Sequence, residues 1–394
     1  MAEMNTFGDL SLKRPLKSNH HGLIGDRLRR TGVAELPLHP GKCPPWLFVR
    51  MKRLGGAITE VIVHEYGRQE FIRRMSDPFF FQALGCVLGF DWHSSGLTTT
   101  VCGALKEALK PEELGVAVCG GKGRASKKAP HEIEEIADEF SLSEKKIDEL
   151  KYASKMSAKV DNACVQDGYQ LYHHCFMLSE DGDWAVVQQG MHERLARRYH
   201  WLSSGVHSFV EEPHSGIAGD RRENVVLDMT ARDSEEARKT SVDLVCDKPE
   251  HLMSYVRDVD QRVLDEYLER SPEVLKLVMP TQHTIELTKR TMVSLRRAYE
   301  LKPENYEELV AIRGVGPKAV RALALVSDLI YGKSPSWKDP ARFSFAHGGK
   351  DGIPFPVDRR TYQKTTEILE GALNEAKLEH HERLKAIRRL HEFL

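Results

Sequence analysis

The sequence predicts an α+β protein, in which a mixed α/β region with a β-hairpin precedes an all-helical region that contains a helix-hairpin-helix. Two observations carry this prediction. Between residues 36 and 230, helical patterns alternate with β-type runs, two of which flank a strong turn signal. From Ser234 onward, apolar residues recur mostly at helical spacing. We therefore expect a basic arm at 1–35, an α+β domain at 36–230 and a helical domain at 231–394.

The first part of the α+β region predicts helices with defined beginnings and ends. Residues 47–65 place apolar side chains at helical spacing, and Asp77-Pro78 begins a second helical run that Gly89 ends. A third helix is expected to run up to Lys110, capped by one of the hydroxyl residues Ser94, Ser95 and Thr98. Residues 131–160 predict a further helical segment, with a capping-box pattern in SLSE at Ser141 to Glu144.

Strands are expected at three places. The run GVAVCGGKG predicts a short buried strand that leads into a glycine loop carrying Lys122. The runs DGYQLYHHCFML and WAVVQQGM are separated by SEDGD, whose Asp181-Gly182 is typical of a hairpin turn. This hairpin places a β element in the middle of the α+β region.

Composition limits the classes of function. Hydrophobic residues make up 41% and charged residues 29% of 394 residues, as in an ordinary folded soluble protein. The net charge of -1 means that a nucleic-acid partner has to be met by a local basic face. The seven cysteines form no CxxC pair, which argues against a disulfide framework and a four-cysteine metal site. Without a leader pattern or a long apolar run, we expect a cytoplasmic protein without a membrane segment.

The sequence RGVGPKAV at 313–320 predicts a tight turn between two helices. Gly314, Val315 and Gly316 form the turn, and Pro317 suits the first position of the helix that follows. Glycines let the backbone pass close to a phosphate, and the free N–H groups at the helix start attract an anion. Together with Lys318, these residues are typical of a helix-hairpin-helix that binds the DNA backbone.

The stretch AIRGVGPKAVRAL resembles the hairpin of the helix-hairpin-helix DNA glycosylases of base-excision repair. Downstream, GIPFPVDRRTYQKT places Pro356-Val357-Asp358 before a helical run, as in that family. The resemblance covers about 80 residues and lacks the iron-sulfur cysteines of some members. It implies a glycosylase with AP lyase activity on a damaged base, with Lys318 as nucleophile and Asp358 as its acidic partner.

That chemistry needs a target base turned out of the DNA stack. An amine at a helix N-terminus, made less basic when bound DNA removes its water, attacks the sugar C1′ and expels the base. The resulting Schiff base permits β-elimination of the strand. The aspartate stabilises cationic sugar character or activates the nucleophile. The separation of Lys318 and Asp358 along the chain is about double that expected of the family.

A second hypothesis is a metal-dependent nuclease in the first domain, with the hairpin only holding DNA. The segment KVDNACVQDGYQLYHH carries two acids and two histidines that together suit Mg²⁺ or Mn²⁺. These candidate ligands are Asp161, Asp167, His173 and His174. Their spacing matches no recognisable ligand motif, so a polar hairpin without metal stays open as the alternative.

Further contacts to nucleic acid are expected from RLARRYHWLSS, which mixes arginines with aromatic residues. Arg194, Arg197 and Arg198 would neutralise phosphates while the aromatic rings stack on bases. The alternative is an amphipathic segment with Trp201 in the core. Lys122, with the polar run GFDWHSSGLTTT, is expected to contribute to an anion pocket, or else to an ordinary turn.

The chain as a whole resembles an uncharacterised prokaryotic family known only as a domain of unknown function. The stretches that carry this resemblance are RTGVAELPLHPGKCPPWLFVRM, GFDWHSSGLTT, GGKG and VVQQGM. Because that family implies no activity, three hypotheses stay open: a glycosylase/AP lyase, a metal-dependent nuclease and a non-catalytic DNA-binding repair factor. All three have DNA as the partner.

Overall fold

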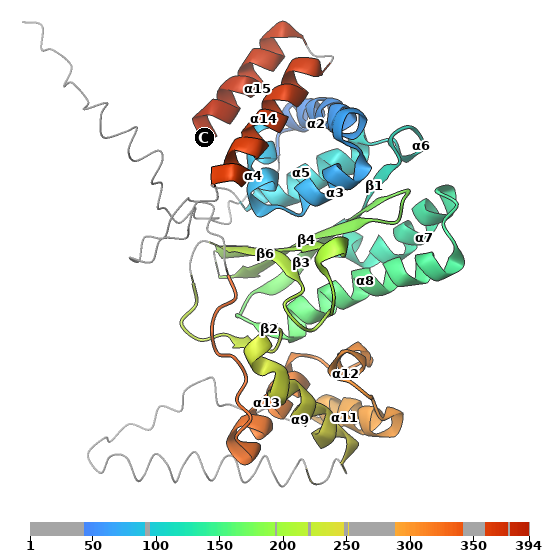
Figure 1. Cartoon of the computed structure of the whole chain (residues 1–394), viewed down its shortest axis with the longest axis vertical. Coiled ribbons are helices and arrows are strands. Elements are labelled where there is room, and N and C mark those ends of the chain that lie inside the picture. The colour runs from blue at the N-terminus through green and yellow to red at the C-terminus, as the bar shows by residue number, and fades with distance from the viewer. Residues whose placement is uncertain are drawn as a thin grey trace, which may run out of the picture.

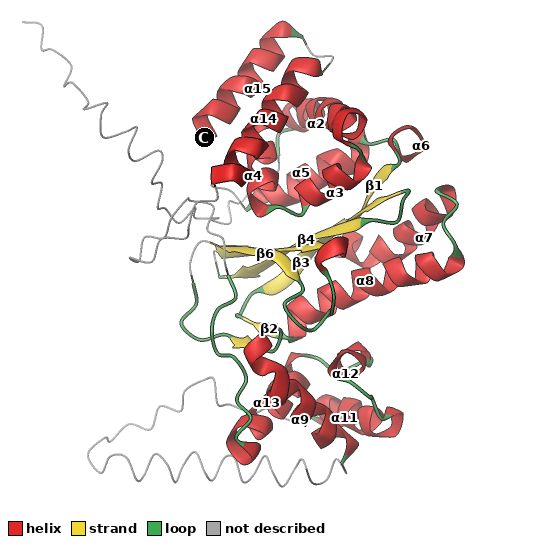
Figure 2. Ribbon diagram, in the orientation of Figure 1, coloured by secondary structure: helices red, strands yellow, loops and turns green. Residues whose placement is uncertain are grey.

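The computed structural model describes residues 43–90, 95–193, 195–219, 222–247, 251, 288–341, 359–376 and 379–393. Within these residues the protein is mixed α and β, with an antiparallel sheet between layers of helices (Figures 1 and 2). No helix among these residues is both long and apolar enough to cross a membrane. The expected α+β class is confirmed.

The central sheet has five antiparallel strands in the order β1-β3-β4-β5-β6. Its strands are β1 (Val116–Lys122), β3 (Gln170–Ser179), β4 (Trp184–His192), β5 (Leu195–Leu202) and β6 (His214–Gly219). β3 and β4 form the expected hairpin, in which Gly182 takes a φ of +83°. A separate two-stranded sheet pairs β2 (Val165–Gln166) with β7 (Leu227–Asp228).

Helices cover both faces of the sheet (Figure 1). One face packs on α2 (Pro45–Tyr66), α3 (Arg68–Met75), α4 (Pro78–Val87) and α5 (Gly96–Ala108), and the short α6 (Pro111–Leu114) leads into β1. The other face packs on α7 (Ala129–Glu139) and α8 (Glu144–Ala163). Alternate residues of each strand therefore belong to different cores, as Phe176 and Met177 do.

Of two expected helix caps, one is confirmed and one is displaced. The Asp77 side chain accepts hydrogen bonds from the amides of Phe79 and Phe80, so Asp77 caps α4 as expected. For α8 the expected capping box is wrong by two residues. Ser143, not Ser141, accepts from the amide of Lys146, at 3.3 Å, because Ser141 takes a positive φ of 57° in the preceding turn.

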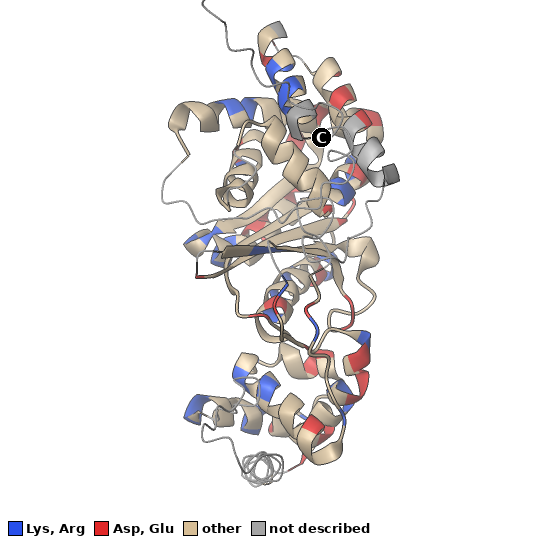
Figure 3. Ribbon diagram, turned by 90° about the vertical axis from the view of Figure 1, so that its left-hand side faces the viewer, with Lys and Arg blue, Asp and Glu red and all other residues tan. Residues whose placement is uncertain are grey.

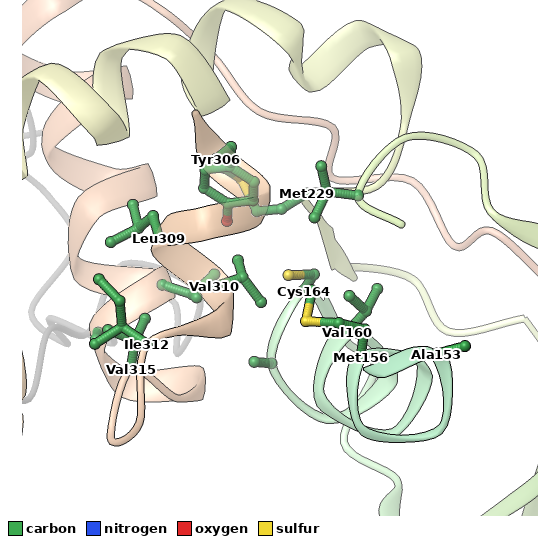
Figure 4. Packing of buried hydrophobic residues seen from close by; sticks show 14 of the residues in the cluster. Ala153, Met156, Val160, Cys164, Met229, Tyr306, Leu309, Val310, Ile312 and Val315 are labelled. Carbon is green, nitrogen blue, oxygen red and sulfur yellow. The ribbon is translucent and has the colours of Figure 1, made fainter. Parts of the chain in front are cut away.

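A third group of helices lies against the far side of α8. It consists of α9 (Glu235–Cys246), α11 (Lys289–Leu301), α12 (Tyr306–Ala311) and α13 (Pro317–Tyr331). Figure 4 shows Val310 and Tyr306 of this group facing Val160 and Cys164 at the end of α8. The same apolar core thus continues from the sheet through α8 into these helices.

The last two helices, α14 (Arg359–Glu375) and α15 (His380–Phe393), lie at the opposite end of the molecule from α9–α13 (Figure 1). Leu369 and Leu373 of α14 and Leu390 of α15 enter the core that α2 and α4 form. The chain therefore returns to the N-terminal helices after residue 341. The domain division at residue 230 stays a prediction.

Candidate nucleic-acid interface

A groove with a volume of about 410 Å³ runs beside α8, between the start of α7 and strand β3. Three lysines line it: Lys127 before α7, and Lys155 and Lys159 on α8. Hydroxyl and amide groups of Ser126, Ser154, Asn162 and Gln188 are among its other polar groups. Among the described residues that line it, none is an aspartate or a glutamate. We refer to it as the lysine groove.

The position of the lysines follows from helical geometry. Lys155 and Lys159 lie four residues apart on α8, so both side chains project from one face of the helix. Ala158 lies beside them in the lining and is short enough to leave space for a ligand. Lys155 is exposed, whereas Lys159 is half-buried. This face of α8 therefore presents positive charge toward the groove.

Burial makes Lys159 chemically distinct. Removal of water around its amine lowers the pKa of Lys159 to about 8. Its Nζ donates a hydrogen bond of 2.5 Å to the carbonyl oxygen of Ile312, the residue that follows α12. An ammonium has three N–H donors, so this bond still leaves donors for a ligand.

The glycine loop around Lys122 borders the lysine groove. A Cβ at Gly120 would overlap the carbonyl oxygen of His174, so only glycine fits against β3 there. Gly121 and Gly123 also take positive φ values, of 139° and 60°, as β1 ends and the 3₁₀ turn of 123–128 begins. Lys122 is exposed, with its amine 5.7 Å from the centre of the Tyr172 ring that lines the groove.

A turn of five residues, 312–316, connects α12 to α13. Gly314 has a φ of +102°, and a Cβ there would lie 3.0 Å from the Cβ of Ser294. Val315 is buried against the core, as Figure 4 shows, while Gly314 and Lys318 are exposed. Gly316 precedes Pro317, the first residue of α13. The sequence predicted this local arrangement of residues.

Hydrogen bonds connect the turn and the start of α13 to α8 and β2. Besides the Lys159–Ile312 bond, the Gln166 amide donates to the carbonyl oxygen of Pro317, at 2.8 Å. Arg321 in turn donates to Gln166, at 3.2 Å. Lys159 of α8 therefore joins the lysine groove to the 312–316 turn, and Gln166 of β2 holds the start of α13.

The helices beyond α8 add further basic residues. Exposed basic side chains of α11 are Lys289, Arg290, Arg296 and Arg297. Figure 3 shows that most Lys and Arg segments of this helical group lie on one side and most Asp and Glu segments on the other. Although the whole chain is almost neutral, its charges are thus separated locally.

Two candidate residues, Arg194 and Asp358, lie outside the described residues. The structure therefore does not place Asp358 relative to Lys318.

The expected surface role of Arg197 and Arg198 is wrong, because both side chains are fully buried in β5. Arg197 pairs with Asp167 at 3.0 Å and with Asp339 at 2.7 Å. Arg198 donates to Thr98 and Gln82, and burial lowers the pKa of Arg198 to about 9. The segment forms a strand inside the sheet, where neither face meets water.

The four expected metal ligands do not form one cluster. Asp161 accepts hydrogen bonds from Trp201 at 3.0 Å and from Gln188 and His214 at 2.5 Å each. Burial raises the pKa of Asp161, while these donors favour its ionised form. Asp167 instead accepts from Arg197 and from the Tyr199 hydroxyl. The carboxylates of Asp161 and Asp167 thus serve two separate buried networks.

The two histidines project to opposite faces of the sheet because they are neighbours in β3. His174 shares hydrogen bonds of 2.9 Å with both Ser154 and Gln188, and burial lowers the pKa of His174 to about 4. His173 lies near Cys102 and Cys175 instead. The expected site for Mg²⁺ or Mn²⁺ is therefore not assembled in the described part of the chain.

Sequence reasoning missed the three groove lysines. Two of them, Lys155 and Lys159, continue a four-residue spacing that starts at Lys151 and is visible in KYASKMSAK. That spacing identifies one face of the helix. The spacing does not reveal which of these lysines is available to a ligand. In the structure, Lys151 pairs with Glu134 of α7 at 3.0 Å instead of lining the groove.

Comparison with known proteins identifies a family whose function is unknown. A family model described as "Protein of unknown function (DUF763)" matches residues 32–357. No curated protein and no solved structure matches the chain. The expected resemblance of the whole chain to a family of unknown function is confirmed.

Proposed function

The chain belongs to this family of unknown function, and we propose that it is a DNA-processing protein that holds the phosphate backbone along the lysine groove and the 312–316 turn. The observation that carries the proposal is the bond from Lys159 to Ile312, because it makes the groove and the turn neighbours. Lysines and a helix N-terminus both attract phosphate. Lys122 and Lys318, which the sequence predicts to contact DNA, both lie at the border of this surface.

The turn supports the proposal by its chemistry. Gly314 and Gly316 leave the backbone uncovered, and α13 begins directly behind them. Three features match a helix-hairpin-helix: the positive φ of Gly314, the buried Val315 that anchors the turn and Pro317 at the first helical position. A phosphate at this point would meet amide donors and the positive end of the helix dipole.

For the reaction we propose Schiff-base chemistry at an abasic site, as in a glycosylase/AP lyase. An amine adds to C1′ of the opened sugar and loses water to give an imine, which permits β-elimination of the 3′ phosphate. Two amines flank the turn. Lys318 is exposed at the start of α13, and Lys159 has the lowered pKa that an attacking lysine needs near neutral pH.

Borohydride trapping on a duplex with one abasic site tests the reaction. We expect the full-length protein to form a covalent adduct because borohydride reduces the imine to a stable amine. Loss of the adduct in Lys318→Ala, with retention in Lys159→Arg, assigns the nucleophile to Lys318. The reverse pattern assigns it to Lys159. The matched control is Lys145→Ala, an exposed lysine at the far end of α8.

The trapping result also decides between the alternatives. Absence of an adduct on every lesion tested, while salt-sensitive binding persists, contradicts the lyase and favours a non-catalytic repair factor. Nicking that stops when EDTA is added favours a metal-dependent nuclease. Asp161 and His174 share Gln188 as a hydrogen-bond partner, whereas Asp167 pairs with Arg197 in a separate network, so the three do not support that nuclease.

DNA affinity is expected to fall several-fold between pH 7 and pH 9. Only the protonated amine of Lys159 attracts phosphate, and its pKa is about 8 in the free protein. Above that pH, DNA binding has to take up a proton, so affinity decreases as pH rises. Fluorescence anisotropy with an undamaged duplex at constant salt measures the effect.

Lys159→Arg is the control, because arginine stays charged over this range. We expect a flatter pH profile for this variant. If DNA affinity decreases equally with pH in the wild-type protein and in Lys159→Arg, a group other than Lys159 is responsible for the pH dependence.

A further inference from the structure

Two thiols and an imidazole meet between α5 and the sheet, away from the lysine residues of the groove. They belong to Cys102 on α5 and to His173 and Cys175 on β3. His173 and Cys175 are alternate residues of the strand, so both project to the face that α5 covers. One ligand atom from each of the three residues lies within 4.8 Å of the other two.

His173 is the unusual member of this cluster. Its side chain is almost fully buried, and among the described residues neither ring nitrogen has a nitrogen or oxygen partner, which leaves the Cys102 thiol beside it. The next residue, His174, has partners on both nitrogens. Buried polar groups in folded proteins are nearly always paired, and here the Cys102 and Cys175 thiols are the groups placed to partner the imidazole.

We propose that Cys102, His173 and Cys175 bind one Zn²⁺ ion. Thiolate sulfur and imidazole nitrogen are the protein ligands that Zn²⁺ prefers, with bonds of about 2.3 and 2.0 Å. At tetrahedral angles, such ligand atoms lie roughly 3.5–3.8 Å apart, which is compatible with a cluster whose atoms all lie within 4.8 Å of one another. Binding deprotonates both thiols, and two thiolates balance the charge of the ion. A buried neutral complex avoids the penalty of an isolated charge.

Charge around the cluster agrees with thiolate ligands. On β5, which β4 separates from β3, the Arg198 guanidinium faces the same side of the sheet and donates hydrogen bonds to Thr98 and Gln82. A nearby guanidinium favours thiolate over thiol. Three protein ligands leave a fourth tetrahedral position for a small exogenous ligand. Because all three side chains are buried, we assign the ion the role of joining α5 to β3.

Zinc content of the full-length protein tests the proposal. After incubation with Zn²⁺ and removal of free metal, we expect one zinc per chain by mass spectrometry of the metal. Cys102→Ser and Cys175→Ser should each lose most of it. Cys119→Ser is the matched control, since Cys119 is an equally buried cysteine of the sheet that belongs to the other core. It should retain the full amount.

X-ray absorption at the zinc edge needs no variant, so it remains decisive if the serine proteins misfold. We expect two sulfur ligands and one imidazole in the wild-type spectrum. Absence of zinc after incubation overturns the proposal, as does zinc without sulfur ligands. A Cys102–Cys175 disulfide, detected as a loss of two hydrogens in the intact mass of metal-free protein purified with reductant present, also overturns it. The site does not depend on the proposed DNA function.

Discussion

Replacing Arg197 by alanine is expected to lower the free energy of unfolding by about 3–5 kcal/mol, since it leaves two carboxylates buried without their partner. The guanidinium lies between Asp167 and Asp339, and the side chains of all three residues are at most 2% exposed. It also lies 4.6 Å from the centre of the Tyr169 ring. Urea unfolding followed by circular dichroism measures the change.

Loss of Arg197 should also loosen the segment that follows α13. Asp339 also accepts a hydrogen bond from the amide of Glu223, at 2.6 Å, and Ala341 packs in the small core with Tyr199. Arg197 therefore fastens the segment after α13 to the sheet. We expect proteolysis of Arg197→Ala to begin near residues 332–341 under native conditions, as detected by mass spectrometry.

Arg232→Ala is the matched control for this variant. Its guanidinium pairs with Glu212 at 3.2 Å, but the side chain is 74% exposed. Exposed pairs contribute at most about 1 kcal/mol. If Arg197→Ala and Arg232→Ala destabilise the protein equally, Arg197 is not the buried centre of an ion network and its role at a DNA surface has to be reconsidered.

The double variant Lys127→Glu/Lys155→Glu is expected to weaken DNA binding on the order of 50-fold at about 0.1 M salt. Each phosphate contact releases a counterion, which is worth roughly five- to tenfold in affinity at this salt concentration. Both side chains are exposed and line the lysine groove, so the fold should tolerate the change. Anisotropy titrations over a range of salt give the affinity and its salt dependence.

The salt dependence distinguishes a lost contact from general repulsion. Removing two phosphate contacts should reduce the slope of log affinity against log salt by about 2. The control Lys127→Glu/Lys145→Glu changes the net charge by the same amount but leaves Lys155 in the groove. Equal losses for the two double variants, with unchanged slopes, would contradict a backbone contact at Lys155.

Local signals predicted much of the fold correctly. Asp181-Gly182 predicts the β3–β4 hairpin because a positive φ at glycine suits that turn. Asp77 predicts the beginning of α4, since its carboxylate meets the amides two and three residues later. Gly314 and Pro317 predict the turn before α13 in the same way. Each of these features depends on residues only a few positions apart.

The candidate site was predicted less well because it combines distant segments. The lysine groove needs the 123–128 turn, α8 and β3 at once, and Lys159 meets Ile312 across 153 positions. Burial also decides whether a basic residue stabilises the fold or is available to bind DNA. Arg197 meets Asp339 in the interior, whereas Lys155 stays at the surface. The mixture of basic and aromatic residues in RLARRYHW is consistent with a buried strand and with a nucleic-acid surface.

By itself, the sequence predicted most of the helices, strands β1, β3 and β4 with the β3–β4 hairpin, and the glycine turn between α12 and α13. Those features follow from periodicity and from backbone angles that a few neighbouring residues control. Only the tertiary structure decided that β5 lies inside the sheet, that His173 and His174 belong to different layers, and that Lys159 meets the turn. Contacts between residues far apart in the chain depend on how whole elements pack, which local patterns do not encode.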